Sequence, residues 1–190
     1  MEKMLEFFAS LNMLSPEELN PERFNTEVLK LKKGDFFIRE GQTCNRVVFV
    51  NKGILRSFYR NHEGEEITYC ITFQDQFMTA YTSLITGNPS HENIQAITDM
   101  ELLVISKAEI DAKMQESPNW IRVMKFFAEQ MYIELERRIF SYQKEKAAER
   151  YEQLIENYPD YVQQIPLQYL ASYLNITPRH LSRIRKEFAL

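Results

Sequence analysis

The sequence predicts an α+β protein: a double-stranded β-helix (jelly-roll) of short strands, then one long helix, then a small helical C-terminal domain. Three observations lead to this fold class. All five glycines lie between residues 34 and 87, and glycine marks the turns that separate short strands. Residues 119–146 contain neither glycine nor proline, as an uninterrupted helix requires. Residues 165–190 carry the apolar spacing of two short helices.

The composition is that of a folded chain with a sizeable core. Of the 190 residues, 44% are hydrophobic, and 13 Phe and 10 Tyr are among them, so disorder is not expected. There is no apolar run of about eighteen residues and no signal-peptide pattern, which predicts a cytoplasmic protein that does not enter a membrane. Cys44 and Cys70 are too few for a disulfide framework or a four-cysteine metal site. Free thiols are expected, and a redox role stays open.

The first part of the chain is expected to begin as helix and continue as strands. Residues 4–24 have a helical pattern, and Ser15-Pro16-Glu17-Glu18 is a start signal for a second short helix. Short runs rich in β-branched and aromatic residues follow, separated by turn residues, and such a series predicts a small jelly-roll. The expected strands are 36–38, 47–50, 54–59, 67–73, 93–97 and 102–105, with turns at 61–64 and 98–99.

After Ser117-Pro118 the sequence predicts one helix to about residue 146, which at ~1.5 Å per residue spans roughly 40 Å. Two apolar stripes run along it, and charged residues between them argue against a helix buried on all sides. One stripe can pack on the strands, whereas the other is best covered by the same helix of a second copy, which predicts a homodimer. The stripe expected at the dimer interface is Trp120, Met124, Phe127, Met131 and Leu135; the other is Val123, Phe126, Ile133 and Phe140.

Residues 165–190 predict a helix-turn-helix. Its first helix buries apolar residues at i, i+3, i+4 and i+7. Asn175 tolerates the left-handed backbone of the turn, and Thr177-Pro178 supplies an N-cap and a proline at the first helical position. The residues expected to face inward are Leu167, Leu170, Ala171, Leu174, Leu181, Ile184 and Phe188.

The second helix of this pair is expected to bind double-stranded DNA in the major groove. Residues 165–190 have a net charge of +3 on a chain of −4, and a basic end on an acidic body is typical of a surface that faces phosphates. A structural hairpin with solvated charges is the alternative. The residues expected to contact DNA are Thr177, Arg179, His180, Ser182, Arg183, Arg185 and Lys186.

Short motifs follow one another in a fixed order along the strand region: Lys33-Gly34-Asp35, Ile38-Arg39-Glu40-Gly41, Val47–Gly53, Glu63-Gly64-Glu65-Glu66 and Thr72–Phe77. With the long helix and the C-terminal helix pair, they resemble the CRP/FNR family of transcription regulators over nearly the whole chain. The resemblance implies a cyclic-nucleotide-binding-like sensor domain at 1–117, a dimerisation helix at 118–146 and a DNA-binding domain at 147–190, with an effector controlling the orientation of the last.

The effector site implied by the resemblance departs from the family pattern. Family members that bind cyclic AMP pair its phosphate with an arginine, but Ser90-His91-Glu92 stands where Arg-Ser/Thr-Ala is expected, and Met78-Thr79 where Gly-Glu is expected. Residues 61–106 contain seven acids and no Lys or Arg, and burying a phosphate without charged donors costs several kcal/mol. We therefore expect no cofactor and no cyclic AMP; an unknown effector, neutral or cationic, stays open, as does none. The expected pocket residues are Phe77, Met78, Thr79, Ser90, His91 and Glu92.

A second departure concerns the end of the chain. In the family a β-hairpin wing follows the recognition helix, whereas this sequence ends at Leu190, so a helix-turn-helix without a full wing is expected. Of the family pattern Arg-Glu-x-x-x-Arg only the final arginine, Arg183, is present. Arg183 is therefore the first candidate for a base contact and Arg179 the second, while the other outward residues would position the helix on phosphates.

Other functions stay open from the sequence alone. A metal enzyme on a jelly-roll needs a His-x-His motif with further ligands, and His62, His91 and His180 are isolated, so no metal site and no enzyme are expected. An interaction module that kept the fold but lost DNA binding is the main alternative, and the salt dependence of DNA affinity separates the two. RNA polymerase would be a partner of an activator, for which the sequence carries no recognisable signature.

Overall fold

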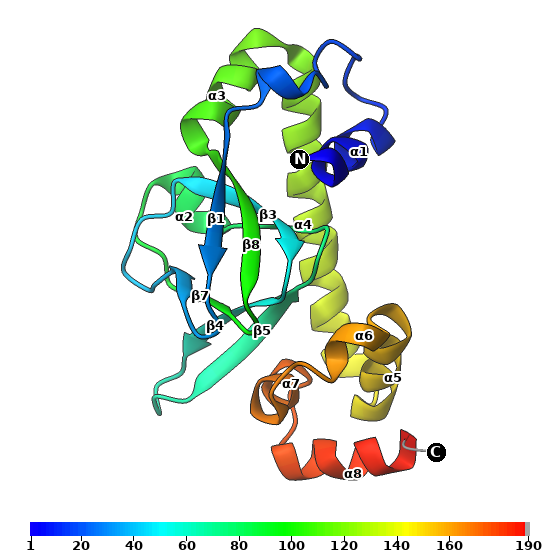
Figure 1. Cartoon of the computed structure of the whole chain (residues 1–190). Helices are drawn as coiled ribbons and strands as arrows, with labels where there is room; N and C mark the ends of the chain where they lie inside the picture. Colours follow the sequence, from blue (N-terminus) through cyan, green and yellow to red (C-terminus); the bar gives the residue numbers. More distant parts are fainter. Residues whose placement is uncertain (189–190) are drawn as a thin grey trace.

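The computed structural model describes residues 1–188 as a roll of antiparallel strands flanked by helices, with α8 at the end remote from the strands (Figure 1). The strands are β1 (Thr26–Leu31), β2 (Phe36–Ile38), β3 (Arg46–Lys52), β4 (Leu55–Arg60), β5 (Glu66–Thr72), β6 (Phe77–Met78), β7 (Asn93–Ala96) and β8 (Met100–Ser106). The helices are α1 (Glu2–Ser10), α2 (Tyr81–Thr86), α3 (Lys107–Glu116), α4 (Pro118–Lys144), α5 (Ala147–Asn157), α6 (Pro159–Val162), α7 (Leu167–Tyr173) and α8 (Pro178–Phe188), with a 3-10 helix η1 (Pro21–Arg23).

Strands β1–β8, the β-roll, form two four-stranded antiparallel sheets in the orders β1-β8-β3-β6 and β2-β7-β4-β5. The register places Leu103 of β8 opposite Val28 of β1 and Phe49 of β3. An apolar cluster fills the space between the sheets, which confirms the expected jelly-roll and α+β class. Its buried members are Phe37, Ile38, Cys44, Val48, Val50, Leu55, Ala80, Ile94, Ala96, Met100, Leu102 and Val104.

Strands β1 and β6 have no counterpart among the expected strands. In β1, Glu27, Val28 and Lys30 are all exposed, so the sequence lacks the alternation that marks a half-buried strand. Its pairing with β8 along all six residues stabilises it instead. β6 has only two residues, held by β3. Both strands therefore depend on neighbours that are distant in sequence.

The second N-terminal helix expected at Ser15 does not form. Its capping box is present: Ser15 Oγ accepts from Glu18 N at 3.2 Å, and Glu18 Oε2 accepts from Ser15 N at 2.7 Å. However, Asn20 is extended, with ψ 123°, because the following Pro21 disfavours helical backbone at the preceding residue. Only one turn and then η1 remain.

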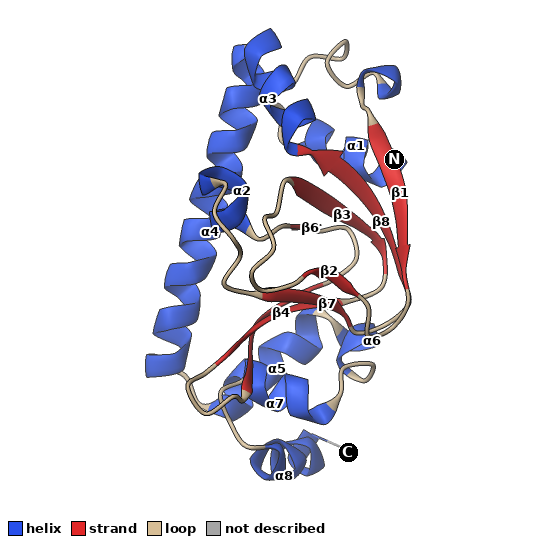
Figure 2. Ribbon diagram, turned by 90° about the vertical axis from the view of Figure 1, so that its left-hand side faces the viewer, coloured by secondary structure: helices blue, strands red, loops and turns tan. Residues whose placement is uncertain are grey.

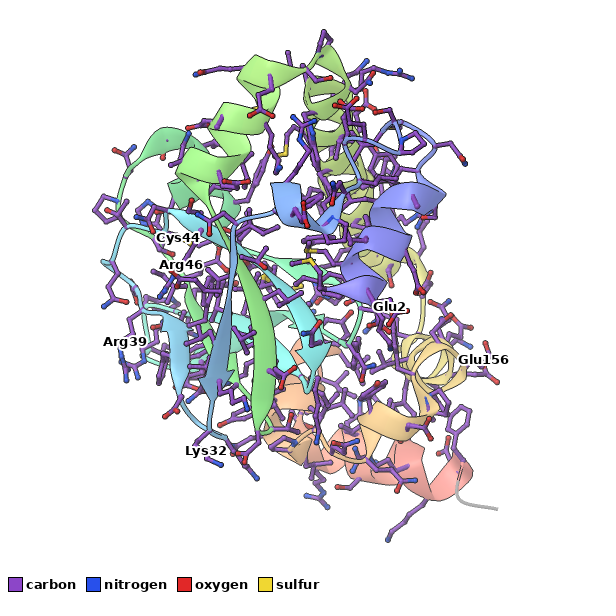
Figure 3. The ribbon with its side chains drawn as sticks, turned by 45° about the horizontal axis from the view of Figure 1, so that its top comes forward. Glu2, Lys32, Arg39, Cys44, Arg46 and Glu156 are labelled. Atoms are coloured by element: carbon purple, nitrogen blue, oxygen red, sulfur yellow. The ribbon has the colours of Figure 1, made fainter. Side chains whose placement is uncertain are left out.

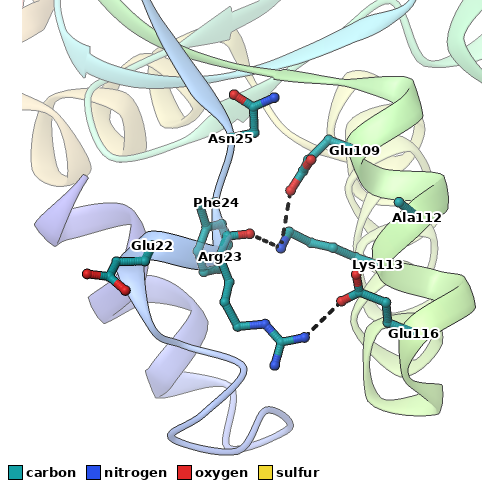
Figure 4. Close-up of a pocket in the computed structure, with 8 residues that line it drawn as sticks. All are labelled: Glu22, Arg23, Phe24, Asn25, Glu109, Ala112, Lys113 and Glu116. Atoms are coloured by element: carbon teal, nitrogen blue, oxygen red, sulfur yellow. Dashed lines mark hydrogen bonds and ion pairs between the residues drawn. The ribbon is translucent and has the colours of Figure 1, made fainter.

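The N-terminal segment is tied to the helices that follow the β-roll. Lys113 of α3 is buried, and its Nζ donates to the carbonyl of Arg23 at 2.6 Å and pairs with Glu109 Oε1 at 3.2 Å (Figure 4). Nζ also lies 4.3 Å from the centroid of the Phe24 ring, at cation–π distance. Since the Lys113 ammonium group is engaged by a carbonyl, a carboxylate and an aromatic ring of the same chain, the groove in Figure 4 is a structural contact between η1 and α3.

The first half of α4 packs on its own β-roll. Trp120 and Val123 are buried in a cluster that includes Phe8 of α1 and Phe49 of β3, and the Trp120 and Phe8 rings lie 5.3 Å apart. Beyond this half, α4 runs down to the C-terminal helices α5–α8, which lie below the second sheet (Figures 1 and 2). The breaks at 117 and 145–146 lie near the expected domain boundaries, which stay predictions.

Candidate nucleic-acid interface

Helices α7 and α8 form the expected helix-turn-helix. Asn175 between them has φ 55°, the left-handed backbone that asparagine tolerates. Thr177 Oγ1 accepts from His180 N at 3.2 Å and so caps α8. The buried contact between the two helices consists of Leu170, Ala171, Leu174, Leu181 and Ile184. Phe188, expected to face inward, is partly exposed but packs its ring edge against Tyr151 of α5, with centroids 5.6 Å apart.

One face of α8 presents three cations to solvent. Arg179, Arg183 and Lys186 are exposed and spaced four and three residues apart, so they share the face opposite Leu181 and Ile184. We call these three residues the reading face. No acidic side chain among residues 1–188 forms an ion pair with any of them, which leaves their charges available to an anionic partner.

The other expected DNA contacts lie at the edges of this face. Thr177 and His180 are exposed at the start of α8. Ser182 Oγ donates to the carbonyl of Pro178 at 3.0 Å, so its hydroxyl proton is already used within the helix. Arg185 is half-buried. Its guanidinium carbon lies 6.0 Å from the ring centroid of Tyr151, so its side chain is turned toward α5.

The end of α7 is held by side chains that the sequence analysis did not identify. Arg138 and Tyr142 of α4 both donate to the carbonyl of Tyr173, at 3.1 and 2.9 Å, and Arg150 donates to the carbonyl of Leu174 at 2.9 Å. These donors satisfy helix carbonyls that have no partner within α7. The only sequence signal was a cluster of basic and aromatic residues near the end of the long helix.

The apolar stripe expected at the dimer interface is wrong in part. Trp120 and Phe127 pack on the β-roll and α1 of their own chain, and Met124 is half-buried. Only Met131 and Leu135 of that set are exposed. The exposed apolar residues of α4 follow a stripe that shares only these two residues with the expected one, because α1 and β6 cover the face that carries Trp120. They are Ile121, Met131, Tyr132, Leu135, Ile139 and Phe140.

The six expected effector residues do not line one pocket. Phe77 faces away from the roll interior and packs against Phe7, Phe49 and Phe127, whereas Met78, next along the strand, faces the interior cluster. This follows from the alternation of side chains along β6. His91 is exposed on the surface.

Two of the remaining effector residues already use their hydroxyl groups in hydrogen bonds within the protein. Ser90 is buried, and its Oγ donates to the carbonyl of Glu92 at 2.9 Å. Thr79 Oγ1 donates at 2.9 Å to the carbonyl of Arg46, which also accepts from Cys44 Sγ at 3.3 Å. Cys44 and Arg46 lie close together at the side of the roll in Figure 3. These residues therefore stabilise loops rather than present free donors.

Glu92 and Met78 do come together, in the company of residues from β4 and β5. The Tyr69 hydroxyl donates to Glu92 Oε2, and Ser57 Oγ lies 3.7 Å from Met78 Sδ. Burial raises the pKa of the Glu92 carboxyl, more than its hydrogen bonds from Tyr69 and Ser57 lower it. The cluster thus has acceptor character and contains no cation.

Arg56 is the buried cation of this region, but it lies on the outer side of the second sheet. Its side chain is 2% exposed, donates to Glu66 Oε2 and Gln95 Oε1, both at 2.6 Å, and stacks under Tyr169 of α7. A charged residue within the strand-like run Leu55–Arg60 was the signal that could have identified it.

Among residues 1–188, no three metal-ligating side chains come together, and Cys44 and Cys70 are free thiols. No helix in this part of the chain is long and apolar enough to cross a membrane.

Comparison with known proteins agrees with this architecture. Residues 28–117 match the model of the cyclic nucleotide-binding domain family. No curated protein sequence matches the chain significantly. Among solved structures, FixK2 from Bradyrhizobium japonicum is similar at 13% identity and a TM-score of 0.76, over 86% of this chain and 84% of that one. A regulator from Eubacterium rectale, described as of the CRP/FNR family, is similar at 18% identity and a TM-score of 0.70, over 96% and 87% of the two chains.

A third similar structure is the c-di-GMP-responsive global regulator CLP from Xanthomonas campestris, at 15% identity and a TM-score of 0.66, over 88% of this chain and 89% of that one. At such identities the likeness shows the fold. These matches show that residues 28–117 are similar to the cyclic nucleotide-binding domain family and that the chain has the fold of the CRP/FNR transcriptional regulators.

Proposed function

We propose that this protein is a dimeric transcriptional regulator of the CRP/FNR type that binds DNA by inserting α8 into the major groove. The observation that carries the proposal is the reading face, which is exposed and cationic while Leu181 and Ile184 anchor the opposite side of the helix. Arg183 lies between the other two cations along α8. An arginine there can donate two hydrogen bonds to O6 and N7 of a guanine, and the flanking cations can neutralise phosphates.

Dimerisation would use the exposed stripe of α4. Ile121, Ala128 and Leu135 are spaced by seven residues, and Tyr132 and Ile139 take the second apolar position of the same repeat. This alternation is that of a coiled-coil seam, which a second copy of the helix can cover symmetrically. A two-fold dimer would present two α8 helices to successive major grooves about 34 Å apart. An operator with two inverted half-sites is therefore expected.

The effector of such a regulator would not be a cyclic nucleotide bound through its phosphate. Glu92 and Tyr69 place an acceptor-rich cluster inside the domain, and the buried Arg56 is engaged on the outer side of the sheet. A phosphate brought to Glu92 would be repelled and left without charged donors. Titration calorimetry with cyclic AMP is expected to show no heat of binding, and saturable micromolar binding would contradict the assignment.

DNA binding is tested by selecting bound duplexes from a random pool and measuring affinity for the selected site over a series of salt concentrations. Contacts with phosphates require affinity to fall steeply with salt. Arg183→Ala is expected to cost ~1–3 kcal/mol and to blur preference at one base pair. Lys30→Ala, which removes the same charge from an exposed position on β1, is the matched control and should leave the selectivity unchanged. Identical profiles for the two variants would refute the role of Arg183, and a flat salt dependence would indicate a protein-interaction module instead.

A further inference from the structure

The C-terminal helices share one hydrophobic core with the β-roll. Ile54, Ile71, Phe73 and Ile97 of the roll belong to the same buried cluster as residues from all four C-terminal helices. The members from the C-terminal helices and the turns between them are Tyr151, Leu154, Val162, Ile165, Leu170, Ala171, Leu174, Leu181 and Ile184. The outer side of the second sheet therefore completes the core of the helix-turn-helix (Figure 2).

A polar contact holds α7 directly on β5. The Arg56 guanidinium lies 3.9 Å from the Phe58 ring centroid and 3.4 Å from that of Tyr169, so it is sandwiched between strand and helix. One turn further along α7, Ser172 Oγ accepts from the backbone N–H of Thr68 at 2.9 Å. The free N–H of an edge strand is thus paired by the helix.

A second contact joins the turn after β5 to Tyr158 and Tyr161. The rings of Phe73 and Tyr158 are stacked, with centroids 3.9 Å apart and planes inclined by 16°. Gln76 Nε2 donates to the Tyr158 hydroxyl at 3.0 Å, and the Tyr161 hydroxyl donates to Gln74 Oε1 at 3.3 Å. The contact with β5 and this one lie on different C-terminal helices, so together they restrain rotation of the helix-turn-helix as well as its translation.

On these contacts we propose that the helix-turn-helix is a fixed part of the β-roll body and binds DNA in this docked orientation, without swinging about the α4–α5 junction. The inference rests on the proposed function. A swing would expose Phe73, Tyr158 and Tyr169 to water and remove one of the two rings that sandwich Arg56. Docking also leaves the reading face free, because α7 faces the sheet and α8 lies beyond it (Figure 1).

A reversible cross-link tests this directly. Thr68→Cys and Ser172→Cys, in a Cys70→Ser background, place two thiols where Thr68 N and Ser172 Oγ are 2.9 Å apart. The remaining Cys44 is buried. If the docked orientation binds DNA, the oxidised and reduced forms will bind the selected site with affinities within about threefold of each other. A loss of more than about tenfold on oxidation, restored by a reductant, would show that the helix-turn-helix must leave the sheet.

Hydrogen exchange on the unmodified protein separates this inference from the proposed function. The amides of Leu170 and Leu181 are expected to open only together with those of Val48 and Leu103 in the roll, with protection factors within about tenfold and the same denaturant dependence. Faster, local opening of the helix-turn-helix would overturn the inference even if DNA binds. If no DNA binds under any condition, the proposed function fails, and the exchange result alone decides whether the two parts form one body.

Discussion

Replacing Arg56 with methionine should destabilise the protein although it removes a buried charge. The change leaves the Gln95 amide oxygen and the Glu66 carboxylate without their donors at 2.6 Å. Breaking a buried ion pair costs roughly 3–5 kcal/mol when the partner stays buried. Glu66 is 35% exposed and keeps Arg60 at 3.7 Å, which reduces the penalty, so we expect a loss of about 2–3 kcal/mol.

Arg60→Met is the matched control, because Arg60 lies on the same strand and faces the same carboxylate but is 62% exposed. Exposed ion pairs contribute about 0–1 kcal/mol, so Arg60→Met should lower the free energy of unfolding by less than about 1 kcal/mol. Urea unfolding of both variants measures the difference. Equal losses for the two, or a loss below about 0.5 kcal/mol for Arg56→Met, would refute the reasoning that burial makes the Arg56 pair the stronger one.

The same substitution measures the contact with the helix-turn-helix. A desolvated cation–π contact contributes up to about 2 kcal/mol, so a double-mutant cycle of Arg56→Met with Tyr169→Ala should give a coupling energy of about 1–2 kcal/mol. Tyr169→Phe keeps the ring and should retain most of that coupling. Strict additivity of the two single losses would mean that the stacking seen at 3.4 Å contributes nothing to stability.

Two further predictions concern the N-terminal segment and the dimer. Burial alone would raise the pKa of Glu18, but hydrogen bonds from Ser117, Ser15 and Asn119 lower it from 4.5 to about 2. The ionised Glu18 carboxylate therefore stabilises the fold above its ordinary pKa, and this stabilisation is lost as pH falls toward 2. The difference in thermal stability between the wild type and Glu18→Gln should therefore shrink from pH 5 downward; a constant difference would contradict this. Leu135→Lys should yield monomers in sedimentation, because Leu135 is 57% exposed in the middle of the α4 stripe, and an unchanged dimer would place the interface elsewhere.

Much of the fold could be predicted because its signals are local. Six of the eight strands follow from β-rich runs between turn residues, and the helix-turn-helix from apolar spacing, Asn175 and the Thr177-Pro178 cap. Strand β1 could not be predicted in this way, because its exposed charged residues break the alternation typical of a strand and its hydrogen bonds come from β8. The helix expected at Ser15 fails for the opposite reason: its capping box is real, but Pro21 stops propagation.

Residue types and their spacing were enough to predict which helix carries the cations, because three basic residues at helical spacing share a face in any α-helix. The absence of Lys and Arg from residues 61–106 is likewise a matter of residue types alone. Which stripe of α4 is free depends instead on the packing of other elements, since α1 and β6 cover Trp120 and Phe127. Packing likewise brings Arg56 under Tyr169 across more than a hundred residues. Periodicity describes one element at a time, whereas burial depends on the elements that pack against it.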